Sequence, residues 1–406
     1  MQPIKNRKTK YIYFFRGDLR SHVGIYKCWS DAAKDSIDIS MLTILDWKTY
    51  LDQKKLVDFY RANGIIIKVI PSKRLKYIFT VLYFISLLIE NKKVVVHLRK
   101  QSPSPFNFVK FFFSERIKYI IEIEGDLESE IQYLSLEKNK YKYNFYTKTI
   151  QGMKKSAAIL GGQLLKADAI FTVTNELKDL FIWRYNKFTL RDKIYIIPTG
   201  FDGEKFYPDR SLRRKYRKKY KLDDKYVMIF TGNLNYSWQN IKRSIEVFKL
   251  LQKSIYQNIY FVMLIRRQDH CIAKEFIENL NLKDNDYLLL NVPHEEVNGF
   301  LNASDLGILL REDHTLNKVA SPGKLGEYLS TGLTVLTTKH IGLYSKEMMK
   351  NNVGVLIDDI YSDNEILEKI QSYKQTKTKE EQSQWAMRKF SVQAYKDIYI
   401  ETLEGL

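Results

Sequence analysis

Short apolar segments recur along the whole chain, and longer amphipathic segments separate most of them. Apolar runs of this length are typical of strands that are buried on both faces of a parallel sheet. The first half of the sequence has strand candidates at residues 11–15, 39–45, 65–70, 94–97, 119–123, 169–173 and 194–197. A second series lies at residues 226–231, 259–265, 287–291, 306–310, 334–337 and 353–357.

The helical segments between the strands predict how the strands are arranged. Strands that alternate with helices form parallel sheets covered by helices on both faces. Two series therefore predict an α/β fold with two doubly wound domains. Pro198, Gly200 and Gly203 follow the first series and mark a boundary. We expect an N-terminal domain at residues 1–200, a C-terminal domain at 201–384, and a final helix at 385–406 that packs back on the N-terminal domain.

Composition and charge narrow the class of protein. The chain has 406 residues, of which 45% are hydrophobic, enough for two domains with cores of their own. Its formal net charge of +19 calls for a negatively charged partner: nucleic acid, an anionic membrane surface or anionic substrates. Two cysteines, Cys28 and Cys271, do not make a disulfide framework. Residues 1–10 lack the apolar core of a signal peptide, so we expect a cytoplasmic protein.

Two segments leave two interpretations open. The longest apolar run, at residues 77–89, is shorter than the roughly 20 residues of a membrane-spanning helix and has basic residues on both sides. It is either a buried helix of an α/β domain or a helix that rests on the cytoplasmic leaflet. Residues 210–221 combine eight basic residues with an apolar stripe of Leu212, Tyr216 and Tyr220. Its basic side chains are either solvated or in contact with the phosphates of a lipid or polymer.

The segment at residues 321–336 is the most informative one for chemistry. Ser321 is a good N-cap and Pro322 suits the first helical turn, so a short helix is expected to begin there and to end at Gly332. The free N–H groups and the positive dipole end of a helix start favour phosphate. Glu327 lies about one turn further along. A phosphate site with a nearby carboxylate is equipped to bind the diphosphate and ribose of a nucleotide.

Other candidates follow from the rule that open α/β sheets bind ligands beyond the carboxyl ends of their strands. In the first domain this edge has a glycine-containing loop that ends at Gly24, a basic loop with Arg99 and an acidic loop with Asp126. In the second domain it has Gly232, Asn233, Trp238, Arg266, Arg311 and Glu312. The triplet Asp284-Asn285-Asp286 precedes a strand and so lies at the wrong end of the sheet for a metal site. The six histidines lack metal-ligand spacing, and we expect no metal or other cofactor.

Four passages resemble the retaining glycosyltransferases of group 1, family four. They are Ser321-Pro322-x-Lys324-Leu325-x-Glu327 with Gly332-Leu333, then residues 197–208, residues 232–241 and residues 124–130. Such enzymes have the GT-B type of fold, with two facing Rossmann-like domains and a cleft between them. The polysaccharide-biosynthesis members transfer a sugar from a nucleotide-sugar to a hydroxyl of a glycan or lipid-linked glycan, with retention and without a metal.

The resemblance implies roles for individual residues. Glu327 would hold the ribose, the backbone at Gly323, Lys324 and Leu325 would meet the diphosphate, and Arg99 would lie at the cleft. The candidate catalytic residues are thus Glu327, Arg99, Glu312 and Asp126. The candidate donor-binding residues are Gly24, Gly232, Asn233, Trp238, Arg266, Arg311, Ser321, Pro322, Gly323, Lys324, Leu325 and Glu327.

The sequence departs from the family pattern at two places. Relatives usually have a second Glu eight positions before the ribose-binding one, where this chain has Val319. They also have Arg and Lys after the glycine of the first strand of the second domain, where this chain has Asn233 and no clear Lys. Glu312 and Arg266 are the candidates to replace these groups.

Two other functions compete with sugar transfer. An inactive assembly partner would bind a nucleotide-sugar without transferring the sugar. A nucleic-acid-binding protein would explain the positive charge, but the basic residues are scattered and match no known binding motif, so we expect no nucleic-acid partner. The expected partners are a nucleotide-sugar, a glycan or lipid-linked glycan, and an anionic membrane surface. The protein would meet this surface at the inner face of the membrane.

Overall fold

This computed structural model describes residues 8–15, 23–99, 103–137, 144–185, 188–234, 237–358 and 362–406. The chain divides into two compact units. The first comprises Met1–Ile131, Tyr143–Pro198 and Tyr395–Leu406, and the second comprises Gln132–Lys142 and Thr199–Ala394. Trp385, which we expected in the returning helix, packs on Phe390 in the core of the second unit, and the chain returns to the first unit at Tyr395.

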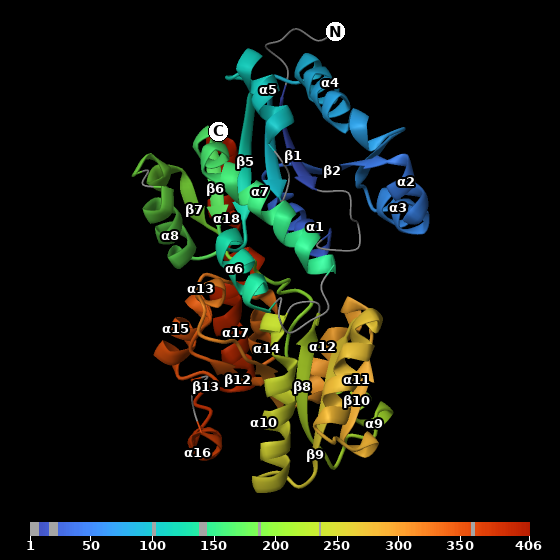
Figure 1. Cartoon of the computed structure of the whole chain (residues 1–406), viewed down its shortest axis with the longest axis vertical. Helices are drawn as coiled ribbons and strands as arrows, with labels where there is room; N and C mark the ends of the chain where they lie inside the picture. Colours follow the sequence, from blue (N-terminus) through green and yellow to red (C-terminus); the bar gives the residue numbers. More distant parts are fainter. Residues whose placement is uncertain are drawn as a thin grey trace. The chain divides into compact units, whose positions relative to one another are not determined.

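Within the described residues, the first unit has a parallel seven-stranded sheet in the order β3-β2-β1-β4-β5-β6-β7. Its strands are β1 Thr9–Phe15, β2 Ile39–Asp46, β3 Ile66–Ile70, β4 Lys93–Arg99, β5 Ile117–Ile123, β6 Ala169–Thr172 and β7 Ile194–Ile196. The helices are α1 Val23–Ala33, α2 Trp47–Asp52, α3 Lys54–Ala62, α4 Lys76–Glu90, α5 Ser104–Phe112, α6 Leu127–Glu137, which continues into the second unit, α7 Asn144–Lys166, α8 Asn175–Tyr185 and α18 Lys396–Gly405. Figure 1 shows α18, coloured red, within this unit.

The second unit has a parallel six-stranded sheet in the order β10-β9-β8-β11-β12-β13, again among the described residues. Its strands are β8 Tyr226–Gly232, β9 Ile259–Ile265, β10 Tyr287–Leu290, β11 Leu306–Leu309, β12 Thr334–Thr338 and β13 Val355–Ile357. The helices are α9 Arg210–Lys219, α10 Ile241–Ser254, α11 His270–Asn279, α12 His294–Ala303, α13 Thr315–Lys318, α14 Gly323–Ser330, α15 Gly342–Asn351, α16 Asp363–Ser372 and α17 Lys379–Phe390.

These two sheets confirm the predicted α/β fold with two doubly wound domains. In each sheet the chain starts near the middle, moves to one edge and then crosses back to build the other side. Both faces of the second sheet are covered: Val227 and Ile229 of β8 face one buried cluster, and Met228 and Phe230 face another. Alternate residues of a strand point to opposite faces, so both sets are apolar when both faces are buried.

Helix α4 buries one face and exposes the other. Phe84 contacts the rings of Phe14 and Phe106 beneath the helix, at centroid distances of 5.8 and 4.8 Å. Ile78 and Leu82, by contrast, are exposed. The interpretation of residues 77–89 as a buried helix thus holds for one face alone. No described helix is both long and apolar enough to cross a membrane.

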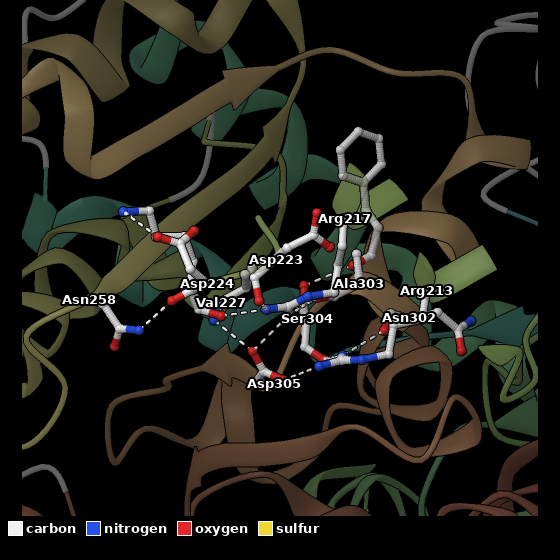
Figure 2. Close-up of polar contacts among 12 residues, drawn as sticks. Arg213, Arg217, Asp223, Asp224, Val227, Asn258, Asn302, Ala303, Ser304 and Asp305 are labelled. Carbon is white, nitrogen blue, oxygen red and sulfur yellow. Dashed lines mark hydrogen bonds and ion pairs between the residues drawn. The ribbon is translucent and has the colours of Figure 1, made fainter. Parts of the chain in front are cut away.

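Helix α9 is attached to the second unit through two of its arginines, as Figure 2 shows. Arg213 and Arg217 both pair with the carboxylate of Asp305, at 2.6 and 3.2 Å, and donate to main-chain carbonyls around it. Asp305 also accepts a hydrogen bond from the backbone N–H of Val227, 2.8 Å away, at the start of β8. A uniformly solvated basic face was therefore the wrong interpretation for these two arginines. They have structural partners, while Tyr216 inserts its ring against Phe300.

Candidate functional site

Helix α14 begins one residue later than the sequence predicts. Pro322 occupies the N-cap position, without a side-chain cap hydrogen bond, and Gly323 is the first helical residue. Ser321 is buried, and its hydroxyl has no hydrogen-bond partner among the described residues. The expectation that Ser321 caps the helix was wrong, because Pro322 brings the chain into the helix directly. The Ser321 hydroxyl consequently lies beside the helix start and makes no hydrogen bond among the described residues.

The position of α14 is fixed from below by its apolar residues. Leu325 and Tyr328 are fully buried. The Tyr328 hydroxyl accepts a hydrogen bond from the backbone N–H of Thr231, 2.7 Å away, and donates to the Thr231 hydroxyl. These bonds hold the helix against the carboxyl end of β8. The helix start and the loop after β8 are thereby held close together.

A pocket of about 270 Å³ lies at this place, at the carboxyl ends of β8, β9 and β10. Sequence-predicted residues on its wall are Gly232, Asn233, Arg266, Lys324 and Glu327. The other lining residues are Thr231, Leu264, Ile265, Asn291, Val292, His294 and Val297. All of them belong to the second unit. Five candidates separated by almost a hundred residues of sequence thus line one pocket.

Positive charge is concentrated on one side of the pocket. Lys324 donates from Nζ to the Gln239 side-chain oxygen at 3.3 Å, and Arg311 donates to the same oxygen at 3.1 Å. Burial, reinforced by the charge of Arg311, lowers the pKa of Lys324 to about 7. Burial also lowers the pKa of Arg311 to about 10. An anion in the pocket would relieve this repulsion and hold both groups protonated.

Arg266 is positioned by a buried carboxylate. Its guanidinium pairs with Asp269 at 3.1 Å and donates to the Asn233 side-chain oxygen at 2.7 Å. Asp269 also accepts a hydrogen bond from the backbone N–H of Leu234. The loop after β8 and the loop after β9 are thus joined at the pocket.

Gly232 lies next to the ammonium group of Lys324. A Cβ atom at this position would lie 3.0 Å from the Phe230 ring and 3.1 Å from Nζ of Lys324. Any larger residue would push the lysine away. The glycine therefore leaves the space next to the ammonium group open.

Glu327 faces a histidine that the sequence reasoning missed. Its carboxylate lies 3.4 Å from Nε2 of His294, the first residue of α12. This hydrogen bond raises the pKa of His294, and burial opposes the rise. His294 comes four residues after β10, so the edge rule applied to that loop would have found it. Gln239, which joins Lys324 to Arg311, lies within a passage already identified but looked like an ordinary polar residue.

Trp238 and Arg311 adjoin the pocket without lining it, and Glu312 does not line it either. The Arg311 guanidinium donates to the carbonyl oxygen of Trp238, which holds the short helix 237–239 beside α14. The Trp238 ring packs edge-on against Tyr133, 5.9 Å between centroids. Glu312 accepts a hydrogen bond from the Tyr133 hydroxyl at 3.0 Å. No described contact places Glu312 in the pocket, so the structure does not support Glu312 as the replacement for the glutamate that relatives have at the position of Val319.

Two of the first-unit candidates, Arg99 and Asp126, form ion pairs with neighbouring side chains. Arg99, at the end of β4, is buried and pairs with Glu124. Glu122 lies close by, and although burial would raise its pKa, the charge of Arg99 and the hydrogen bond to His97 lower it to about 2. The basic and acidic loops that we expected to be open to ligand thus include a partly buried ion pair.

Asp126 has a structural explanation. It is fully buried, accepts hydrogen bonds from the amide and hydroxyl of Ser129, and pairs with Arg184 of α8 through both carboxylate oxygens. We assign it no catalytic role. Gly24 is the second residue of α1, and the loop before it, residues 16–22, lies outside the described residues, as do residues 100–102. No cluster of three or more potential metal ligands occurs among the residues that the structure describes.

The pocket lies within a segment that matches the model of a protein family. Residues 213–390 match the model of the family described as glycosyl transferases group 1. The matching segment contains every residue that lines the pocket. Comparison with curated protein sequences finds no match.

Solved structures match over nearly the whole chain and show the fold. HepE of Anabaena, in complex with UDP-glucose, is 16% identical with a TM-score of 0.65, covering 97% of this chain and 100% of that one. A glycosyltransferase from Rickettsia africae is 14% identical with a TM-score of 0.66, covering 98% of each chain. WaaG, a glycosyltransferase involved in lipopolysaccharide biosynthesis, is 14% identical with a TM-score of 0.56, covering 97% of this chain and 98% of that one. The protein therefore has the GT-B fold, and the group 1 match covers most of its second unit.

Proposed function

We propose that this protein is a glycosyltransferase that moves a sugar from a nucleotide-sugar to a hydroxyl group of a glycan or lipid-linked glycan. The observation that carries the proposal is the pocket in which Lys324, Arg266 and Glu327 converge beside the start of α14. The group 1 match of the same segment and the UDP-glucose complex of HepE, which shares the fold, support it.

The basic side of the pocket suits the diphosphate of the donor. The ammonium group of Lys324, the guanidinium of Arg266 and the amides at the start of α14 would bind its oxygens. When the sugar leaves, negative charge grows on the departing nucleoside diphosphate, and groups already in place stabilise it most. Because these groups supply the positive charge, the proposed reaction needs no metal ion.

Glu327 is proposed to bind the ribose hydroxyls. Its carboxylate is held one turn into α14 and partly exposed to the pocket, with His294 as its neighbour. Two adjacent hydroxyls donate well to one carboxylate, and that pairing would orient the nucleotide across the pocket. Retention of the anomeric configuration, a hexose as the transferred sugar and an acceptor in cell-surface polysaccharide synthesis at the inner face of the membrane complete the proposal.

Release of nucleoside diphosphate tests the activity. Purified protein is incubated with a panel of nucleotide-sugars and a lipid-linked acceptor, and the released diphosphate is measured with and without EDTA. We expect release from one donor, no effect of EDTA, and a loss of at least tenfold in Lys324→Ala. Lys274→Ala, an exposed lysine on α11, is the matched control and should retain activity. No release and no binding of any donor would exclude the enzyme.

A second function, an inactive partner that binds nucleotide-sugar, is favoured by one observation. At the position where relatives have a second glutamate this chain has buried Val319, and Glu312 contacts Tyr133 and does not line the pocket. The described pocket consequently has one carboxylate, that of Glu327. Binding of a donor without release of diphosphate, with acceptor present, would identify this function.

A further inference from the structure

Helix α5 carries three exposed phenylalanines, and the ring of Phe112 contacts the rings of the other two. Phe111 is 82% exposed, Phe112 62% and Phe108 47%. The ring of Phe112 lies 5.0 Å from that of Phe111 and 5.4 Å from that of Phe108. Single exposed apolar residues are common on protein surfaces, but a contiguous aromatic cluster usually marks an interaction site.

Helix α4, which packs against α5, also carries exposed apolar side chains. Helices α4 and α5 pack side by side at one end of the first unit (Figure 1), where Phe84 and Phe106 meet on their inner sides. Ile78 and Leu82, one helical turn apart on α4, are 57% and 60% exposed. A helix with apolar residues on both faces can pack one face on its own core and use the other to bind a partner.

The sequence segment that carries this surface is rich in basic residues. From residue 73 to residue 112 the sequence has eight basic residues and a single acidic one, Glu90. Lys73 and Arg74 are exposed directly before α4. Aromatic and aliphatic side chains bordered by lysine and arginine suit the interface of an anionic bilayer, where the rings enter the headgroup region and the cations meet lipid phosphates.

We propose that this surface, formed by Ile78, Leu82, Phe108, Phe111 and Phe112 with Lys73 and Arg74, docks the protein on an anionic lipid bilayer. A second copy of the chain is a poorer occupant, because it would bring a net charge of +19 against the same positive surface. The inference rests on the proposed function for its setting, since a lipid-linked acceptor lies in such a bilayer. The docking surface is the face of the first unit that would meet this bilayer.

Flotation with lipid vesicles tests the docking surface. The full-length protein is mixed with vesicles of phosphatidylglycerol and phosphatidylcholine, or of phosphatidylcholine alone, and the bound fraction is measured. We expect binding to the anionic vesicles that weakens with salt, and a decrease of about tenfold or more in Phe111→Ser/Phe112→Ser. Lys73→Glu/Arg74→Glu should weaken binding as well, with less salt dependence.

The matched control is Tyr207→Ser/Met349→Ser, which removes two half-exposed apolar side chains from the second unit and should bind vesicles like the wild type. Unaltered vesicle binding by the double phenylalanine variant would overturn the proposal. So would sedimentation showing that these phenylalanines hold a dimer together.

UDP affinity, measured on the same preparations, separates this proposal from the enzymatic one. A wild-type thermal unfolding profile of the phenylalanine variant shows that its first unit is folded, so its loss of vesicle binding then counts for the docking surface. Vesicle binding without affinity for any nucleotide would leave the docking surface standing and refute the donor site.

Discussion

The ammonium group of Lys324 is buried near the positive charges of Arg311 and Arg266, and near the negative charge of Glu327. Burial and the nearby guanidinium groups lower its pKa to about 7, so the group is half neutral near physiological pH in the empty pocket. A diphosphate bound beside it would favour the charged form and raise this pKa again. Donor binding and protonation of Lys324 are therefore coupled.

This coupling predicts a pH dependence of UDP affinity. Above pH 7 the empty protein must take up a proton when UDP binds, and affinity should fall by up to about tenfold for each pH unit. Below that pH Lys324 is already protonated and contributes no further change. Calorimetry in buffers of different ionisation enthalpy measures both the affinity and the proton uptake. In Lys324→Arg, whose side chain stays charged, a dependence as steep as that of the wild type would contradict the assignment.

Glu327 and Lys324 should differ in which part of the nucleotide they recognise. Glu327→Ala is expected to weaken UDP binding by roughly tenfold or more, the effect of losing a charged hydrogen-bond acceptor. Its affinity for inorganic pyrophosphate should not change, because pyrophosphate has no ribose. Lys324→Ala should weaken both ligands, and displacement of a fluorescent nucleotide measures all four affinities. Equal losses for the two ligands in Glu327→Ala would refute the ribose role.

The sequence predicted those candidates whose role depends on their place along a strand or helix. Gly232, Lys324 and Glu327 lie at the carboxyl edge because β8 and α14 end and begin where the apolar pattern stops. The buried pairing of Asp126 could not be foreseen, because its partner, Arg184, lies far away in the sequence. A single sequence contains no sign of such a pairing, and an unpaired acidic loop looks like a binding loop.

Helix α14 packs so closely against its neighbours at Gly326 that a side chain there would collide with them. A Cβ atom at Gly326 would lie 2.5 Å from Cδ1 of Phe201 and 2.9 Å from the Tyr344 hydroxyl. Both neighbours are buried aromatic residues, so they have little room to move. The helix is thus seated directly on the segment that opens the second unit.

Gly326→Ala is expected to lower the free energy of unfolding by about 1–3 kcal/mol, the usual cost of overpacking a core. Urea unfolding followed by tryptophan fluorescence measures it. Gly152→Ala on α7 is the control, since nothing lies within 4 Å of a Cβ atom there and alanine favours a helix. If both variants unfold at the wild-type urea concentration, α14 is not as tightly seated as the contacts indicate.

At the level of elements the strands were the easiest to predict and the arginines of α9 the hardest. A parallel strand covered on both faces is apolar at successive positions, as in Val227 to Phe230, and this pattern needs no tertiary information. Arg213 and Arg217 look solvated in a helix rich in basic residues. Their roles depend on Asp305, which follows in sequence only after β8, β9 and β10.

The whole molecule is built so that the first unit uses both ends of the chain. Helix α18 belongs to it, and Tyr399 of this helix is buried, with its hydroxyl 3.0 Å from Nδ1 of His97 and its ring 4.8 Å from that of Trp29. The second unit, by contrast, is nearly continuous in sequence. The stability of the first unit thus depends on the last residues.

Tyr399→Ala should therefore destabilise the first unit by about 3–5 kcal/mol, the cost of removing a large buried aromatic side chain. Thermal unfolding measures the loss, and UDP affinity of the folded variant should stay at the wild-type value because the pocket lies in the second unit. Tyr195→Ala, which removes a partly exposed tyrosine of β7, is the milder control. A loss of UDP affinity at temperatures where Tyr399→Ala remains folded would contradict this separation.

The late position of α18 has a consequence for synthesis on the ribosome. Domains fold as they emerge, from the N-terminus onward. All seven described strands of the first sheet leave the ribosome before residues 199–394 of the second unit do. The rings of Trp29, His97 and Phe171, however, are covered by Tyr399 only once that residue has been translated. A chain released before α18 has been made would leave these aromatic side chains without Tyr399, so folding of the first unit can be completed only after α18 has left the ribosome.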